Sequence, residues 1–456
     1  EYRQAFENSN LALDFGYTKG YKKTSLAKAS GEKNHFFSKF EKNFNYDDSE
    51  NNLKIITQDV SNDKYLKLYK INRELANKDI DTLENSLNFA HSSNDLYVGL
   101  SASMFETLDN GYVDKYEYVL PEITLDKNLF SDFSYGSLDL QSNIKVHNYD
   151  TNKTTKFLVN NFDWGYRDLN FGTGIQTKIL SKVKNINYET KNVKEFKEDT
   201  TNELHGAIGF LNKIDMYKKI NNFSEHFLKP KLLLRYAPGE MRKTSNGSRL
   251  NPTDAFTLDR LNDNNNFEKG LSTTLGFDYE IRQQDRKFEL SVAQIINEKE
   301  NNNMPSITSL DEKTSDFVGS TNLKINDNFK FKYNFALDEN YNDLNYNELS
   351  ASIINNKLNF DFSYLQEKKH IGLNEYVKPS VSYNDKNTLV SFENKRNLIT
   401  NSSEFYNLSY EYINDCLRAG LVYRREFYND SEIEAEDSLM FKITLVPFGN
   451  VNAPSF

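Results

Sequence analysis

Hydrophobic and polar positions alternate with a period of two along most of the chain. In one segment after another, an apolar side chain at every second position is followed by Lys, Asp, Asn or Ser. This period is typical of β-strands, because successive side chains of a strand point to opposite faces of the sheet. The pattern predicts strands over residues 11–17, 36–46, 96–104, 138–146, 271–281, 329–337, 358–364 and 439–446.

The segments between these strands have the composition of turns and loops. Residues 262–266 and 301–303 are runs of Asn and Asp, which favour turn conformations. Only residues 71–87 approach a helical period, and they are too polar to predict a helix. Proline is scarce, with 8 residues in the chain, as the hydrogen-bonded interior of strands requires. The sequence therefore predicts an all-β chain without a domain boundary.

The length of the alternating segments favours a membrane protein over a soluble sandwich. Several run for about nine residues or more, which is what a tilted strand needs to cross a hydrocarbon layer. Aromatic residues gather at predicted strand ends, as the aromatic girdles of such proteins do; they include Tyr112, Tyr116, Tyr118, Phe130, Phe133 and Tyr135. We expect a large antiparallel transmembrane β-barrel of about 20–24 strands, at roughly 20 residues per strand. A soluble β-rich surface protein is the alternative.

Composition fits a sheet with two unlike faces. Hydrophobic residues make up only 38% of the chain, yet aromatic residues make up 14%, and the mean hydropathy is -0.73. A disordered chain would be poor in aromatic residues, because it lacks apolar surface to bury. The net charge of -10 offers no basic footprint for nucleic acid. No apolar run approaches 18 residues, so transmembrane helices are excluded.

Few residues suggest bond chemistry. The six histidines lie far apart without the spacing of metal ligands, so neither a metal site nor a cofactor is predicted; they are His35, His91, His147, His205, His226 and His370. A Ser/His pair stays open, because its members need not be neighbours in sequence. Gly172 and Gly174 lack the third glycine of a dinucleotide loop and predict a bulge or bend in a strand.

A cluster of charges near the end of the chain offers a candidate binding surface. Arg418, Arg424 and Arg425 are followed by an acidic run over 432–437. With Lys442, Arg418 and Arg424 are candidate charges of a barrel lumen, where they would steer an anionic substrate. The alternative is a cross-strand ladder of charges followed by a solvated loop.

Five stretches carry a resemblance to a known family. They are residues 121–123 at a predicted strand start, Asp163-Trp164, residues 228–238 with the long loop 251–270, residues 407–425, and the closing strand 439–445. In this order they resemble LptD, the family of lipopolysaccharide-assembly proteins of the outer membrane. The resemblance covers most of the chain and is strongest in its last third.

The resemblance implies a transport function without bond chemistry. Members of this family are large outer-membrane barrels preceded by a periplasmic jelly roll, which receives lipopolysaccharide from periplasmic bridge proteins. The glycolipid enters the lumen and leaves sideways, into the outer leaflet, between the first and last strands. A plug lipoprotein of the LptE type sits inside. A porin or importer, and an outer-membrane lipid hydrolase with a Ser/His pair, are the alternatives.

The resemblance also assigns parts of this chain. Residues 1–456 correspond to the barrel domain, and we expect the jelly roll and the first strands to lie outside this sequence. The last strand of the lateral gate would be the segment with Leu439, Phe441, Ile443 and Leu445. Relatives carry adjacent cysteines that join barrel and jelly roll, whereas this chain has only Cys416, a candidate for such an interdomain disulfide.

Overall fold

The computed structural model describes most of the chain, and its secondary structure is almost entirely β. The described residues are 2–23, 28–69, 71, 73–78, 80–108, 114–170, 172, 174–221, 223–370, 372–414, 417–426, 437–445 and 449–452. Within them lie 26 strands, one α-helix of four residues and two short 3-10 helices. The prediction of an all-β chain is confirmed.

The strands are, in chain order, β1 (Tyr2–Phe6), β2 (Ser9–Lys23), β3 (Lys28–Tyr46), β4 (Ser49–Val60), β5 (Thr82–Ser92), β6 (Leu96–Thr107), β7 (Tyr116–Asp132), β8 (Gly136–Tyr149), β9 (Lys153–Gly165), β10 (Leu169–Asn170), β11 (Ile175–Lys191), β12 (Thr201–Ile214), β13 (Met216–Asn221), β14 (Ser224–Ala237), β15 (Gly270–Gln283), β16 (Arg286–Asn297), β17 (Phe317–Ile325), β18 (Phe329–Leu337), β19 (Leu344–Asn355), β20 (Leu358–Glu367), β21 (Asn374–Asp385), β22 (Thr388–Asn397), β23 (Ser402–Ile413), β24 (Leu417–Glu426), β25 (Asp437–Leu445) and β26 (Gly449–Asn452). The helices are α1 (Tyr65–Leu68), η1 (Asp254–Phe256) and η2 (Ser306–Thr308). Every predicted strand coincides with an observed one, apart from Val446, which lies outside the described residues.

The strands pair antiparallel, mostly with their neighbours in sequence. Ladders link each strand from β1 to β9 with the next, and each strand from β14 to β26 likewise. Between these runs, β9 and β10 pair with β11, while β12 and β13 pair with β14. Short hairpin turns make this order possible, because antiparallel neighbours need only a few connecting residues. The antiparallel class is therefore also confirmed.

Three local predictions need correction. Pro121 lies inside β7 and not at a strand start. The register of β7 shifts beside it, against both β6 and β8. A bulge at this position tolerates proline, which has no backbone N–H to donate to the neighbouring strand. Gly172 and Gly174, both at positive φ, lie between β10 and β11 and form a turn instead of a bulge within a strand. The strands are also more numerous than predicted, because very short ones such as β10 and β26 were not anticipated.

Residues 1–167, 180–207 and 264–267 form one compact unit. Its main apolar core lies where the segment around α1 packs on the sheet, with Phe37, Leu66 and Leu83 completely buried. Beside this core, His35 Nε2 lies 3.2 Å from Asp14 Oδ1, which also accepts a hydrogen bond of 2.6 Å from Arg73. These contacts give the buried His35 and one oxygen of the buried Asp14 polar partners.

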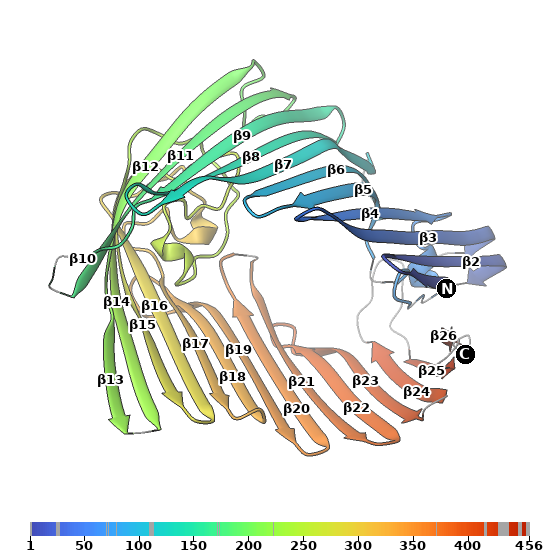
Figure 1. Ribbon diagram of the computed structural model, residues 1–456. Coiled ribbons are helices and arrows are strands. Elements are labelled where there is room, and N and C mark those ends of the chain that lie inside the picture. The colour runs from blue at the N-terminus through green and yellow to red at the C-terminus, as the bar shows by residue number, and fades with distance from the viewer. Residues whose placement is uncertain are drawn as a thin grey trace. The chain divides into compact units, whose positions relative to one another are not determined.

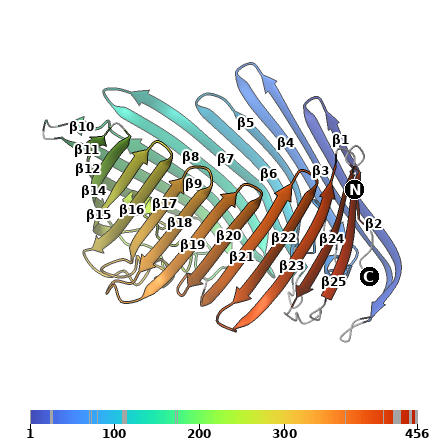
Figure 2. The same ribbon diagram turned by 90° about the horizontal axis from the view of Figure 1, so that it is seen from below.

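Residues 168–179, 208–263 and 268–456 form the second unit. Its strands β14 to β25 lie side by side in chain order (Figures 1 and 2). The β14–β15 and β16–β17 connections are long, and both fold back onto one face of this sheet. There Leu261 and Met304 from the loops pack against Leu233, Ala293 and Ile295 of the strands. This unit contains the candidate site.

Aromatic residues mark the β7–β8 turn of the first unit. Phe133 and Tyr135 are 78% and 71% exposed, and the backbone carbonyl of Tyr135 accepts a hydrogen bond from the Trp164 indole. The Arg167 guanidinium lies 4.3 Å from the centre of the Phe133 ring. Aromatic side chains with one polar edge suit a membrane interface. Tyr112, another residue of the predicted girdles, lies outside the described residues.

Candidate functional site

The two faces of the sheet in the second unit differ in chemistry. One row of residues, paired in register from β16 to β25, is polar throughout; it consists of Lys287, Lys324, Lys330, Ser352, Asp361, Ser380, Glu393, Asn407, Arg424 and Ser438. We call the face that carries this row the polar face. Both long loops pack on it, since Val318 and Ala293 of their core lie on the same face.

The opposite face is apolar and exposed. A second row in register, from β17 to β25, consists of Ile325, Phe329, Ile353, Phe360, Val381, Phe392, Leu408, Tyr423 and Leu439. From Ile353 onward every member of this row is an exposed large hydrophobic residue. Soluble monomers rarely expose an apolar area of this extent. We call it the apolar face, and its chemistry is that of a lipid-facing surface.

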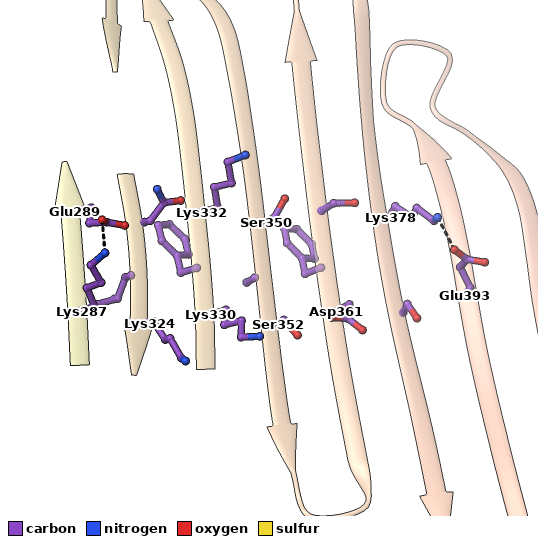
Figure 3. Close-up of a pocket in the computed structure, with 17 residues that line it drawn as sticks. Lys287, Glu289, Lys324, Lys330, Lys332, Ser350, Ser352, Asp361, Lys378 and Glu393 are labelled. Atoms are coloured by element: carbon purple, nitrogen blue, oxygen red, sulfur yellow. Dashed lines mark ion pairs between the residues drawn. The ribbon is translucent and has the colours of Figure 1, made fainter. Parts of the chain in front are cut away.

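A groove of about 630 Å³ runs over the polar face from β16 to β22. Lysines dominate its charge: Lys287, Lys324, Lys330, Lys332 and Lys378 line it, against Glu289, Asp361 and Glu393. Figure 3 shows these side chains on neighbouring strands, with serines among them. We call it the lysine groove. The arrangement can hold an anion without any bond chemistry.

Three lysines of the groove are paired with acids, two of them with acids that also line the groove. Lys287 lies 2.6 Å from Glu289, and Lys378 lies 2.5 Å from Glu393 (Figure 3). Lys324 pairs with Asp327 in the adjoining turn at 2.8 Å. Because these pairs are partly exposed, each contributes little to stability. The centre of the groove keeps the cationic character.

The loop-covered end of the polar face holds buried charges. Arg260 donates to both carboxylate oxygens of Glu268, and it also donates to Ser272 Oγ at 3.0 Å. Arg235 donates to the carbonyl oxygens of Leu258 and Glu268 at 2.7 and 2.6 Å. Burial raises the pKa of the Glu268 carboxyl, but the two guanidiniums outweigh it and hold that pKa below its usual range. These contacts fix the β14–β15 loop to the sheet.

A second cavity, of about 580 Å³, lies between loop residues 249–254 and the polar face. It adjoins the lysine groove, because Glu289 and Asn322 line both. At its border the Arg249 guanidinium lies 3.6 Å from the centre of the Tyr346 ring and pairs with the buried Glu367. Polar surface thus continues from the lysine groove to the covered end of the sheet.

A third group of charges holds the β16–β17 loop beside the β20–β21 turn. Asp316 Oδ1 accepts a hydrogen bond of 2.9 Å from Asn345, and Lys369 lies 3.8 Å from the same oxygen. Lys369 also pairs with Glu312 at 3.1 Å. Burial raises the pKa of Asp316 to about 6, although Lys369 and Asn345 counteract it. Burial likewise raises the pKa of Glu312.

The structure brings the predicted charges onto one face. Arg424 belongs to the polar row, and Arg418 lies on the same face of β24, six residues away. Lys442 of β25 is paired with Gly420, which shares that face. The Arg418 side chain lies 4.0 Å from Glu411 on the neighbouring strand. Of the acidic run 432–437, only Asp437 is described, and it lies 3.3 Å from Arg425.

The predicted gate residues lie on β25. Leu439 and Phe441 are 50% and 48% exposed, and register places them with Ile443 on the apolar face, while the backbone of Leu445 pairs with Leu417. A further strand follows, because β26 pairs with Lys442–Leu445 of β25. This pairing covers only the end of β25 among the described residues. Cys416 lies outside the part of the chain that the structure describes.

The histidines form no catalytic group among the described residues. His226 Nε2 lies 3.4 Å from Ser224 Oγ, but its Nδ1 contacts the Tyr279 hydroxyl at 2.7 Å and no carboxylate. His35 is buried between Asp14 and the Tyr65 hydroxyl. In the described residues, no group of three or more His, Cys, Asp or Glu side chains could hold a metal ion. A hydrolytic triad is thus not assembled in this part of the molecule.

Sequence reasoning missed the lysine groove. Its signal was present in residues 324–332, where Lys324 precedes a turn and Lys330 and Lys332 alternate with phenylalanines after it. That alternation placed Lys330 and Lys332 on one face of a strand, but only the register of β17 and β18 sets Lys324 opposite Lys330. No helix in the described part of the chain is both long and apolar enough to cross a membrane.

Solved structures offer only weak likenesses. The FrpB iron transporter from Neisseria meningitidis (F3-3 variant) aligns at 9% identity and a TM-score of 0.44, over 97% of this chain and 77% of its own. The siderophore receptor PirA from Acinetobacter baumannii aligns at 9% identity and 0.36, over 97% and 74%. A BenF-like porin from Pseudomonas fluorescens Pf-5 aligns at 8% identity and 0.30, over 98% of each chain. Likenesses at this level carry no argument about function.

Comparison by sequence is decisive. No curated protein matches the chain, but residues 33–384 match the family described as LptD, LPS transport system D. The match covers well over half of the chain and includes both the loop-covered end of the polar face and most of the lysine groove. It confirms the family that the resemblance indicated, while residues 407–425 and 439–445 lie outside the match. The chain therefore belongs to the LptD family of the lipopolysaccharide transport system.

Proposed function

We propose that this protein inserts lipopolysaccharide into the outer leaflet of the outer membrane, with its strands forming one barrel domain over residues 1–456. The observation that carries the proposal is that two rows of residues, one polar and one apolar, run along opposite faces of strands β17 to β25. A polar face suits the hydrated headgroup of a glycolipid, and an exposed apolar face suits the surrounding lipid. The family supplies the substrate class.

The exit route that we propose is a lateral gate between the two ends of the sheet. Opening a sheet within lipid exposes unpaired backbone groups, at a cost of several kcal/mol for each group. A gate is therefore best placed where the pairing is already short. Among the described residues, β1 pairs only with Ser9–Leu13 of the long strand β2 at one end, and β26 pairs only with Lys442–Leu445 of β25 at the other. Both ends thus have little pairing to lose.

The proposal includes partners that the family suggests. A plug lipoprotein of the LptE type would occupy the lumen, and a periplasmic jelly roll, joined through Cys416 by a disulfide, would receive the substrate from bridge proteins. Arg418, Arg424 and Lys442 would face the passing headgroup from the polar face of β24 and β25. In this proposal the protein carries out no bond chemistry, and export is driven from outside the barrel.

The gate can be tested by cross-linking. Cysteines introduced at Phe15 or Tyr17 of β2 would be combined with cysteines at Leu439 or Phe441 of β25, and surface lipopolysaccharide would be measured before and after oxidation. We expect oxidation of a joined pair to stop export, because the closed seam blocks the headgroup.

The matched control joins Tyr423 and Leu439, which already face each other on β24 and β25. A disulfide there should leave export unchanged. Single-cysteine variants control for reaction with the native Cys416. Export that continues with the seam completely cross-linked would overturn the gate.

A further inference from the structure

The centre of the lysine groove places like charges directly opposite each other. Lys324 of β17 is in register with Lys330 of β18, and Lys287 of β16 is in register with Lys324. Lys332 lies two residues from Lys330 on the same face of β18. Like charges opposite each other in a sheet are destabilising. An arrangement of four lysines on three neighbouring strands therefore calls for a compensating charge.

The described residues form no close ion pair with two of the four, and Asp327 and Glu348 act on these two only at longer range. Lys287 pairs with Glu289, and Lys324 with Asp327. Lys330 and Lys332 are exposed and form no ion pair within 4.0 Å in the described part of the chain, although both line the groove. Their ammonium groups are thus available to a ligand.

Another opposed pair of lysines in the same unit shows the usual solution. Lys213 of β12 is in register with Lys231 of β14. Each has an acid of its own, Asp168 at 2.7 Å for Lys213 and Asp278 at 2.9 Å for Lys231. The sheet thus neutralises opposed lysines where its own acids are at hand. At Lys330 and Lys332 it leaves the charge to an external anion.

The spacing fits an anion with several oxygen atoms. Neighbouring strands lie about 4.8 Å apart, and residues i and i+2 of a strand about 7 Å apart, so long flexible lysines can converge on one group. Ser350 and Ser352 are in register with Lys332 and Lys330, and their hydroxyl groups line the groove. Ammonium and hydroxyl donors together suit a phosphate, whose oxygens accept several charge-assisted hydrogen bonds.

We propose that Lys324, Lys330 and Lys332 form a binding site for a phosphate group of the glycolipid headgroup on its way through the protein. The site rests on the proposed function and adds to it a point of retention on the polar face. Asp361, one strand beyond Ser352 in the polar row, bounds the site with a negative charge. A neutral sugar would gain little from three ammonium groups, so the phosphate is the part recognised.

The test is a binding measurement on the whole protein, purified in detergent. The probes are fluorescent lipopolysaccharide and the same preparation after enzymatic removal of its phosphates. The variant is the triple Lys324→Gln, Lys330→Gln, Lys332→Gln. Its control is the triple Lys357→Gln, Lys368→Gln, Lys386→Gln, which makes the same change in net charge at lysines outside the groove.

We expect the groove variant to bind the phosphorylated probe at least ten times more weakly than the wild type, and the control to stay within about twofold. Dephosphorylation should weaken binding to the wild type tenfold and leave the groove variant unaffected. The comparison of the two probes on the wild type needs no variant, so it still tests whether the protein recognises phosphate if the triple variant fails to fold.

The outcomes separate this site from the proposed function. If the wild type binds both probes equally and the groove variant binds like the wild type, the phosphate site is wrong and the transport function stands. If the wild type retains neither probe, the proposed function itself is contradicted. Inorganic phosphate at millimolar concentration should compete with the phosphorylated probe alone, and equal competition in the groove variant would also contradict the site.

Discussion

The polar face carries charges at both of its ends, but it treats them differently. At the loop-covered end, Arg235, Arg260 and Glu268 are almost completely buried, and two guanidiniums surround one carboxylate. In the lysine groove, Lys330 and Lys332 are exposed and face no acid within 4.0 Å among the described residues. The two ends belong to one sheet. Strands β15 and β16 pair with each other at the covered end, and β16 also contributes residues to the groove.

The difference separates polar residues that hold the fold from polar residues that serve a ligand. A buried charge must be paired and hydrogen-bonded, since an isolated ion in the interior costs several kcal/mol. Charges at the covered end meet this requirement and fix a loop. An exposed charge needs no partner, so a cluster of exposed like charges does not arise from folding requirements. Polarity alone therefore does not identify the binding surface, whereas the lack of pairing does.

The largest loss of stability is expected from replacing the buried carboxylate of Glu268. Glu268→Gln leaves the guanidiniums of Arg235 and Arg260 buried without their shared carboxylate. Removing one partner of a buried ion pair costs about 3–5 kcal/mol. We expect the unfolding midpoint of the protein in urea, measured in lipid vesicles, to fall accordingly.

Glu280 on β15, the strand that follows the loop with Glu268, provides a control. Glu280 pairs with Arg282 and Lys287 in a partly exposed position, so Glu280→Gln should cost less than about 1 kcal/mol. Equal losses for the two variants would show that burial does not distinguish the two ends of the polar face.

An intermediate effect is expected at Asp316, beside the β16–β17 loop. Its pKa of about 6 in the folded protein lies above the ordinary value of 3.8, so between pH 4 and 6 the folded state holds a proton that the unfolded state has released. Stability should therefore fall as the pH rises through this window. Asp316→Asn removes the ionisation, and it should stabilise the protein by about 1–2 kcal/mol at pH 8 but not at pH 4.

The measurement is the unfolding midpoint of both proteins at several pH values between 4 and 8. Asp311→Asn provides a control, because it removes the same charge from another carboxylate on the same loop. A constant difference between wild type and Asp316→Asn across the pH range would contradict the raised pKa.

Much of this fold could be predicted from the sequence, because strand periodicity is local. The alternation of Phe329, Phe331 and Tyr333 with lysines and Asn334 is sufficient to identify β18 and its two faces. That Arg418 and Arg424 share one face of β24 was not predicted and follows from the observed ladder.

Register and loop packing could not be predicted, because they depend on residues far apart in the chain. Nothing near Lys324 reveals that Lys287 lies opposite it, since that pairing depends on the long loop between β16 and β17. The role of Arg235 was likewise hidden, because its partners belong to loop residues more than twenty positions away. Short strands such as β26 leave too few alternating residues to be recognised.

The smallest expected effect, and the one of opposite sign, concerns the stability of the groove variant without ligand. Replacing Lys324, Lys330 and Lys332 with Gln removes opposed like charges, so it should raise the free energy of unfolding by at most about 1 kcal/mol at low salt. Salt screens such exposed charges, so the gain should disappear at 1 M sodium chloride. A protein destabilised by this variant would show that the lysines hold the fold, as Glu268 does. A gain in stability together with weaker binding of phosphorylated lipopolysaccharide would mean that these lysines are kept for the ligand, since the sheet is more stable without them.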